Sequence, residues 1–92
     1  MKINEGYILR EMAGAQKGTY IVVAVGKATE KLPGYLTLNE TGAFIWKTLE
    51  KGATEEEVVL ALSNEYDAPY CTISNDVKCV IETLRKIGAL DD

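Results

Sequence analysis

The fold is decided by residues 38–46, which read Leu38-Asn39-Glu40-Thr41-Gly42-Ala43-Phe44-Ile45-Trp46. The pattern of the chain changes here, because the segments before Asn39 have the composition of strands and the segments after it have the apolar spacing of helices. Asn39 is a favoured N-cap residue, so we predict a helix that begins after it, runs to about Lys51 and ends at Gly52. Gly42 lies on the apolar face of this helix, which predicts close packing against a neighbouring segment.

Three short segments in the first half of the chain predict strands, at Tyr7–Glu11, Thr19–Val25 and Tyr35–Leu38. The second is the clearest, because it is rich in β-branched residues. Residues 13–18 have the glycine-containing composition of a turn between the first two strands. Before the third strand, the sequence Leu32-Pro33-Gly34 suits a type II turn, in which glycine takes a positive φ.

Two further helices are predicted in the second half. Thr54 and Glu57 have the spacing of a capping box, in which each side chain binds a backbone N–H at the start of the helix. Pro69 interrupts the chain, and Ser74 is predicted to cap a third helix that runs through Ile87. The buried face of this helix is predicted to carry Val77, Val80, Ile81 and Leu84.

This order of elements predicts an α+β fold, in which a three-stranded antiparallel sheet is followed by a three-helix bundle. So small a sheet must bury one face on the helices, and the single tryptophan, Trp46, is expected to pack between them. The length of 92 residues fits one domain that spans residues 1–92.

The charge of the chain is acidic and unevenly distributed. The net charge is −4. Residues 1–46 carry five basic and four acidic side chains, whereas residues 47–92 carry five basic and ten acidic ones. Because a nucleic-acid-binding protein usually presents a basic face to the phosphates, the acidic helical half argues against nucleic acid as a partner.

The residue types needed for common catalytic and metal sites are scarce. The chain has no histidine, and its only cysteines are Cys71 and Cys79. Two cysteines do not supply the four ligands of a structural zinc site, and no histidine is present to activate a cysteine nucleophile. No glycine-rich phosphate loop appears. We therefore expect a binding protein with no metal and no cofactor, rather than an enzyme.

The sequence also predicts a cytoplasmic protein without a membrane segment. Its longest strongly apolar stretch, Tyr20–Val25, is far shorter than the roughly 20 residues of a membrane-spanning helix. The N-terminal residues lack the basic and then apolar regions of a signal peptide.

Residues 38–46 resemble the hallmark segment of the PqqD-like family, whose members are also called RiPP recognition elements, after ribosomally synthesised and post-translationally modified peptides. Later segments resemble the family pattern as well. They are residues 54–58, residues 65–67, Asp76-Val77, Leu84 and residues 88–90. Leu9-Arg10-Glu11 and Tyr20-Ile21-Val22-Val23 fit the pattern as well, so the resemblance spans nearly the whole chain.

The resemblance implies a winged-helix-like fold with three antiparallel strands and three helices, which matches the order predicted from the residues. It also implies a non-catalytic chaperone that binds the leader segment of a precursor peptide. The leader joins as an extra strand beside the third strand, in a groove shared with the third helix. A partner enzyme, often a radical S-adenosylmethionine (radical SAM) enzyme, then modifies the core peptide in the biosynthesis of a cofactor or natural product.

The residues that the resemblance assigns to peptide binding lie on the third strand and the third helix. They are Tyr35, Leu36, Thr37, Leu38, Asp76, Cys79, Val80 and Thr83. The strand segment has neither of the lysine and proline residues that often protect a sheet edge. Alternate residues of an edge strand point their N–H groups outward, and the sequence leaves open whether these are Tyr35 and Thr37 or Leu36 and Leu38.

Two other functions fit the same predicted fold. One is a winged-helix nucleic-acid-binding domain, against which the acidic helical half argues. The other is a dimerisation module that pairs the same edge strand with a second copy. We expect a monomer or a weak dimer.

Overall fold

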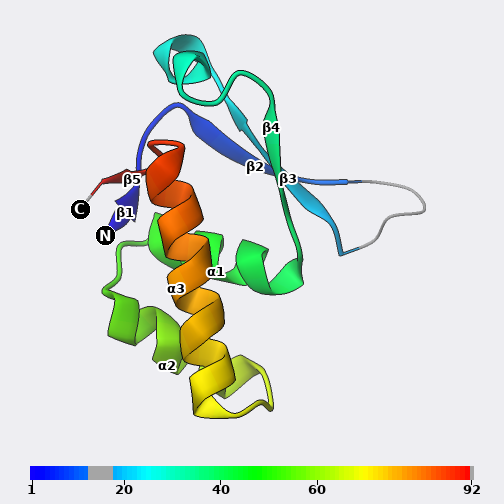
Figure 1. Cartoon of the computed structure of the whole chain (residues 1–92), viewed down its shortest axis with the longest axis vertical. Helices are drawn as coiled ribbons and strands as arrows, with labels where there is room; N and C mark the ends of the chain where they lie inside the picture. Colours follow the sequence, from blue (N-terminus) through cyan, green and yellow to red (C-terminus); the bar gives the residue numbers. More distant parts are fainter. Residues whose placement is uncertain (13–17, 92) are drawn as a thin grey trace.

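The computed structural model describes residues 1–12 and 18–91 and places three helices beside a three-stranded sheet (Figure 1). The strands are β1 (Lys2–Ile3), β2 (Tyr7–Glu11), β3 (Tyr20–Ala24), β4 (Tyr35–Leu38) and β5 (Leu90–Asp91). The helices are the 3-10 helix η1 (Gly26–Glu30) and the α-helices α1 (Glu40–Glu50), α2 (Glu55–Glu65) and α3 (Tyr70–Lys86). The predicted α+β class is confirmed. Most of the predicted turn between the first two strands, residues 13–17, lies outside the described residues.

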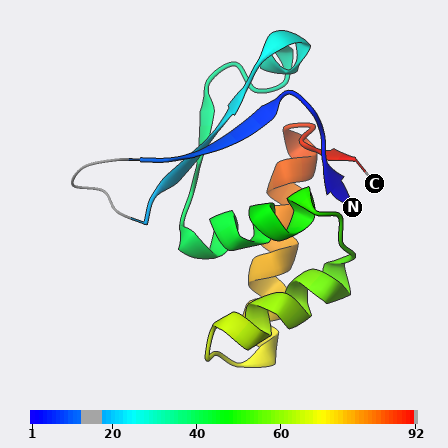
Figure 2. The same ribbon diagram turned by 180° about the vertical axis from the view of Figure 1, so that it is seen from behind.

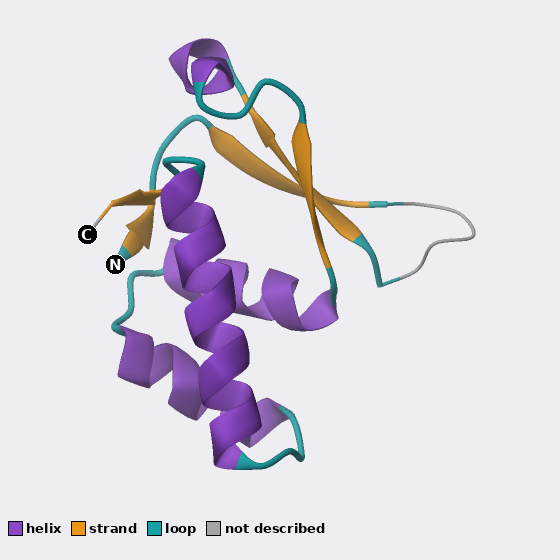
Figure 3. Cartoon of the chain, viewed as in Figure 1, coloured by secondary structure: helices purple, strands orange, loops and turns teal. Residues whose placement is uncertain are grey.

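Strands β2, β3 and β4 form an antiparallel sheet with β3 in the centre (Figure 3). Val22 in the middle of β3 lies opposite Leu9 of β2 and Leu36 of β4. Its side chain is fully buried on the face that meets the helices. The predicted second strand is one residue too long at each end, and Val25 instead serves as the N-cap of η1.

The connection between β3 and β4 differs from the prediction. Gly34 does not take a positive φ, so the predicted type II turn is wrong. The chain instead leaves β3 through Gly26, whose φ is +62°, and reverses its direction over η1. Because η1 makes the reversal, Pro33 and Gly34 only lead the chain into β4.

Helices α1 and α2 begin as the sequence predicts. The Gly42 N–H donates to Asn39 Oδ1 at 2.8 Å, which confirms Asn39 as the N-cap of α1. At α2, Thr54 N–H donates to Glu57 Oε1 at 2.9 Å and Glu57 N–H donates to Thr54 Oγ1 at 3.1 Å. Each cap satisfies backbone N–H groups that have no partner within the helix.

Helix α3 begins five residues earlier than predicted. It starts at Tyr70 directly after Pro69, and Ser74 lies within it. A proline just before a helix needs no N–H partner, and its fixed φ, here −59°, suits the helix entrance. The Ile73 N–H donates to the Pro69 carbonyl at 3.1 Å and closes the first turn. The prediction that Ser74 caps α3 is therefore wrong, because Pro69 starts the helix.

A second, two-stranded sheet joins the beginning and the end of the chain, where β1 pairs with β5 (Figure 1). Asn4 strengthens this junction, because its N–H donates to the Ala89 carbonyl at 2.7 Å and its side-chain amide donates to the Gly88 carbonyl at 2.8 Å. The Tyr7 hydroxyl donates to the Ile87 carbonyl nearby. Strands of two residues are too short to show alternation, so the sequence pattern did not predict this sheet.

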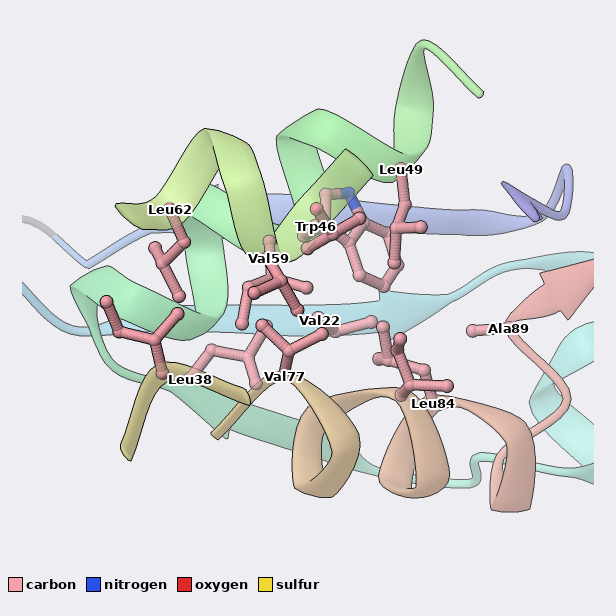
Figure 4. Packing of buried hydrophobic residues seen from close by; sticks show 13 residues of the cluster. Val22, Leu38, Trp46, Leu49, Val59, Leu62, Val77, Leu84 and Ala89 are labelled. Carbon is pink, nitrogen blue, oxygen red and sulfur yellow. The ribbon is translucent and has the colours of Figure 1, made fainter. Parts of the chain in front are cut away.

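The core lies between the inner face of the large sheet and the three helices (Figure 4). Trp46 is fully buried at its centre, as predicted, and Leu38, Val22 and Val77 join the sheet to the helices. Figure 2 shows α1 crossing in front of α3, with α2 below α1. The packing predicted for Gly42 is confirmed, because a Cβ atom there would lie only 3.1 Å from Leu38 Cδ2.

Two negative findings apply to the described residues. No helix among them is long and apolar enough to cross a membrane. They also contain no group of three or more histidine, cysteine, aspartate or glutamate residues placed to hold a metal ion.

The burial of Trp46 gives a test of the core. We expect Trp46→Ala to lower the free energy of unfolding by about 3–5 kcal/mol, because it removes the largest fully buried side chain and leaves a cavity. Leu60→Ala in α2 is the control, because Leu60 is 62% exposed and its loss should change stability by less than about 0.5 kcal/mol. Denaturant unfolding measures both, and equal midpoints for the two variants would contradict this core.

Candidate peptide-binding site

Strand β4 forms one edge of the large sheet, and among the described residues it pairs only with β3. The other edge is β2, which contains the charged residues Arg10 and Glu11. Strand β4 reads Tyr-Leu-Thr-Leu and carries no charge. Because charged side chains discourage the addition of a further strand, β4 is the edge better suited to accept a guest strand.

Hydrogen bonds at the two ends of the β2–β3 ladder settle which groups of β4 are free to pair. Met12 N–H donates to the Thr19 carbonyl at 2.9 Å, and Val25 N–H donates to the Gly6 carbonyl at 2.8 Å. Backbone groups alternate in direction along a strand, so residues 19, 21, 23 and 25 direct theirs toward β2. Tyr20 and Val22 therefore direct theirs toward β4.

The register of β3 and β4 then determines which two residues of β4 direct their backbone groups outward. Tyr20 lies opposite Leu38 and Val22 lies opposite Leu36, so these two leucines bond to β3. Tyr35 and Thr37 direct their N–H and C=O groups away from the sheet. The alternative that the sequence left open is resolved in favour of Tyr35 and Thr37.

The side chains of β4 alternate between the two faces of the sheet, in the same pairs as the backbone directions. Those of Tyr35 and Thr37 are exposed on the face away from the helices. Leu36 is partly buried against the core, and Leu38 is buried within it, at 8% exposure. The four predicted strand residues therefore lie at one edge. Two direct backbone groups outward that have no partner among the described residues, and two anchor the strand.

A small hollow of about 150 Å³ lies between the start of α1 and the middle of α3. Asp76, Cys79 and Val80 line it from α3, and Asn39, Thr41 and Gly42 line it from the opposite side. Asn39 is the residue that links β4 to α1. The hollow is therefore next to the end of the open edge.

The structure brings three of the four predicted helix residues together at this hollow. The fourth, Thr83, lies one turn farther along α3 and does not line it, and its hydroxyl donates to the Cys79 carbonyl at 2.9 Å. Asn39, Thr41 and Gly42 were not predicted as site residues. The signal that could have identified them is their position in the hallmark segment, where their residue types predicted only capping and packing.

Comparison with known protein families identifies the family of this chain. The model for the coenzyme PQQ synthesis protein D (PqqD) family matches residues 20–90, which include β3, β4 and all three α-helices. The chain belongs to the PqqD family. The resemblance predicted from the sequence is confirmed, and PqqD-type domains are binding domains rather than catalytic ones.

A solved structure has the same fold as this PqqD-family chain. It is TbiB1 in complex with the TbiA(beta) leader peptide, with a TM-score of 0.75 and 23% sequence identity over 99% of this chain and 95% of TbiB1. The arrangement of three antiparallel strands and three helices is therefore shared with TbiB1. No curated protein matches the sequence significantly.

The backbone directions in β4 can be tested through stability. Proline removes an N–H group, so Leu36→Pro should break a bond to β3, whereas Thr37→Pro should leave that ladder intact. Relative to alanine at the same position, we expect proline to cost about 1–3 kcal/mol more at Leu36 than at Thr37. Thermal and denaturant unfolding of the four variants measures this difference. A larger proline cost at Thr37 would contradict the assigned direction.

Proposed function

We propose that this chain binds the leader segment of a ribosomally made precursor peptide by strand addition at β4 and presents the peptide to a modifying enzyme. The observation that carries the proposal is the outward direction of the backbone groups of Tyr35 and Thr37 on an uncharged edge. An extended peptide paired there gains main-chain hydrogen bonds without disturbing the bonds between β3 and β4.

The hollow beside this edge supports the same proposal. A guest strand alternates its side chains between the two faces of the sheet, so every second residue faces the helices. The hollow lined by Cys79 and Val80 is small and partly apolar, which suits one modest side chain of a leader. In the proposal, Asp76 and Thr83 flank this contact along α3.

The fold shared with TbiB1, which was solved with a leader peptide, is consistent with a peptide ligand. We propose a radical SAM enzyme as the partner, as the family resemblance implies, and a cytoplasmic setting in which the precursor is made. We propose a monomer or a weak dimer, and a dimer formed through β4 would compete with the leader for the same edge.

Strand addition is tested most directly at Thr37. With a peptide selected on this chain from a displayed library as the probe, we expect Thr37→Pro to weaken binding about tenfold or more. The proline removes an outward donor, whereas Thr37→Ala keeps it and should change the affinity by less than about threefold. Calorimetric titration measures both. Equal binding by Thr37→Pro and the parent would place the peptide site elsewhere.

The two cysteines provide an independent test of the groove. Both are exposed on α3, but Cys79 lines the hollow and Cys71 does not. In a Cys71→Ala variant, a bulky maleimide on Cys79 should block leader binding, because it fills the space beside the edge. In a Cys79→Ala variant, the same label on Cys71 should have no effect. Unchanged leader binding after labelling of Cys79 would exclude this groove.

The same edge would also allow self-pairing with a second copy of the chain, which is the dimerisation alternative. Light scattering across a range of concentrations separates the two. A stable dimer that dissociates on Thr37→Pro, with no leader binding by the parent, would support the dimerisation module and overturn the leader site.

A further inference from the structure

The outer face of the large sheet, away from the helices, carries a second hollow that the proposed groove does not use. It measures about 520 Å³ and is lined by Met12, Thr19, Ile21, Tyr35 and Thr37. None of these five side chains is charged. Tyr35 is 67% exposed and Met12 is 39% exposed, so large apolar groups border open space here.

The register explains why the hollow reaches the open edge. Thr37 of β4 lies opposite Ile21 of β3, and Tyr35 lies opposite Val23. On the outer face, the short Thr37 side chain therefore stands between the open edge and Ile21, beside the much larger Tyr35. A long side chain that enters from the edge can cross above Thr37 and reach Ile21.

A guest strand places its side chains on this face at defined positions. Residues directly opposite each other on paired strands project from the same face of the sheet, whether the strands are parallel or antiparallel. The guest residue opposite Thr37 therefore projects from the outer face, and its neighbours in the guest project toward the helices. Cβ atoms of opposite residues lie roughly 4.5–5.5 Å apart, which brings the guest side chain over Thr37.

We propose that this outer-face hollow is a second subsite for the bound leader, and that it takes one large apolar side chain, aliphatic or aromatic, from the residue opposite Thr37. The inference rests on the proposed function, because the leader must first pair with β4. The side chain crosses above Thr37 and packs against Tyr35 and Ile21. The leader is then recognised on both faces of the extended sheet.

The chemistry of the lining selects the size and polarity of the side chain. A small residue opposite Thr37 stays at the edge, because Ile21 lies one strand farther away, at a strand spacing of about 4.8 Å. A charged residue would lose hydration against five uncharged side chains without gaining an oppositely charged partner among them. Arg10 shares this face and lies opposite Ile21 on β2, but it does not line the hollow.

The experiment uses the full chain and, as the probe, a peptide selected on it from a displayed library of short random sequences. Thr37→Trp fills the hollow while keeping the backbone N–H, and we expect it to weaken binding about tenfold. Tyr35→Ala removes one wall and should weaken binding roughly fivefold. Ile8→Ala is the matched control, because Ile8 is 38% exposed on the same face but does not line the hollow. It should bind as the parent does.

An alanine scan of the selected peptide completes the test. One large apolar residue should matter to the parent and lose most of its effect in Tyr35→Ala, which shows that the two side chains interact. The subsite is wrong if Thr37→Pro abolishes binding while Thr37→Trp and Tyr35→Ala bind as the parent. If Thr37→Pro also binds as the parent, strand addition fails and the subsite fails with it. A dimer that Tyr35→Ala dissociates without any loss of peptide affinity would assign the hollow to a second copy of the chain.

Discussion

The contact between Gly42 and Leu38 is the constraint on which the rest of the structure depends. Only Asn39 separates the last residue of β4 from the first residue of α1, and a Cβ atom on residue 42 would lie 3.1–3.2 Å from two Leu38 atoms. The first turn of α1 can therefore pack directly on the strand that precedes it. This sharp corner holds the start of α1 beside the end of β4, and the small hollow against α3 opens there.

The alternation of an extended strand separates the stabilising part of β4 from its binding part. Side-chain face and backbone hydrogen-bond direction both repeat every two residues, so the two properties stay coupled along the strand. Leu36 and Leu38 turn their side chains to the core and their backbone groups to β3. Tyr35 and Thr37 expose their side chains on the outer face and direct their backbone groups away from the sheet. A guest strand at this edge thus uses groups on which the fold itself does not depend.

This arrangement suits recognition of a peptide whose sequence is only partly fixed. In the proposed complex, backbone pairing would supply affinity that is largely independent of side chains, and the hollows on the two faces of the sheet would supply selectivity at alternate positions. The membership of the chain in the PqqD family agrees with a binding role of this kind. In the proposed function, the chemistry on the peptide belongs to a partner enzyme, and this chain contributes position and specificity.

The sequence by itself determined the local features, because capping and apolar spacing act over a few residues. Asn39, the Thr54–Glu57 capping box, the three main strands and the buried Trp46 were all predicted, as was the family from residues 38–46. Local signals misled at Ser74 and at Pro33-Gly34, where Pro69 and η1 control the chain instead. Only the tertiary structure decided the β1–β5 pairing, the hollow between α1 and α3, and the outward direction of Tyr35 and Thr37. These depend on register and on contacts between distant segments, and the residues of β4 alone are compatible with either direction.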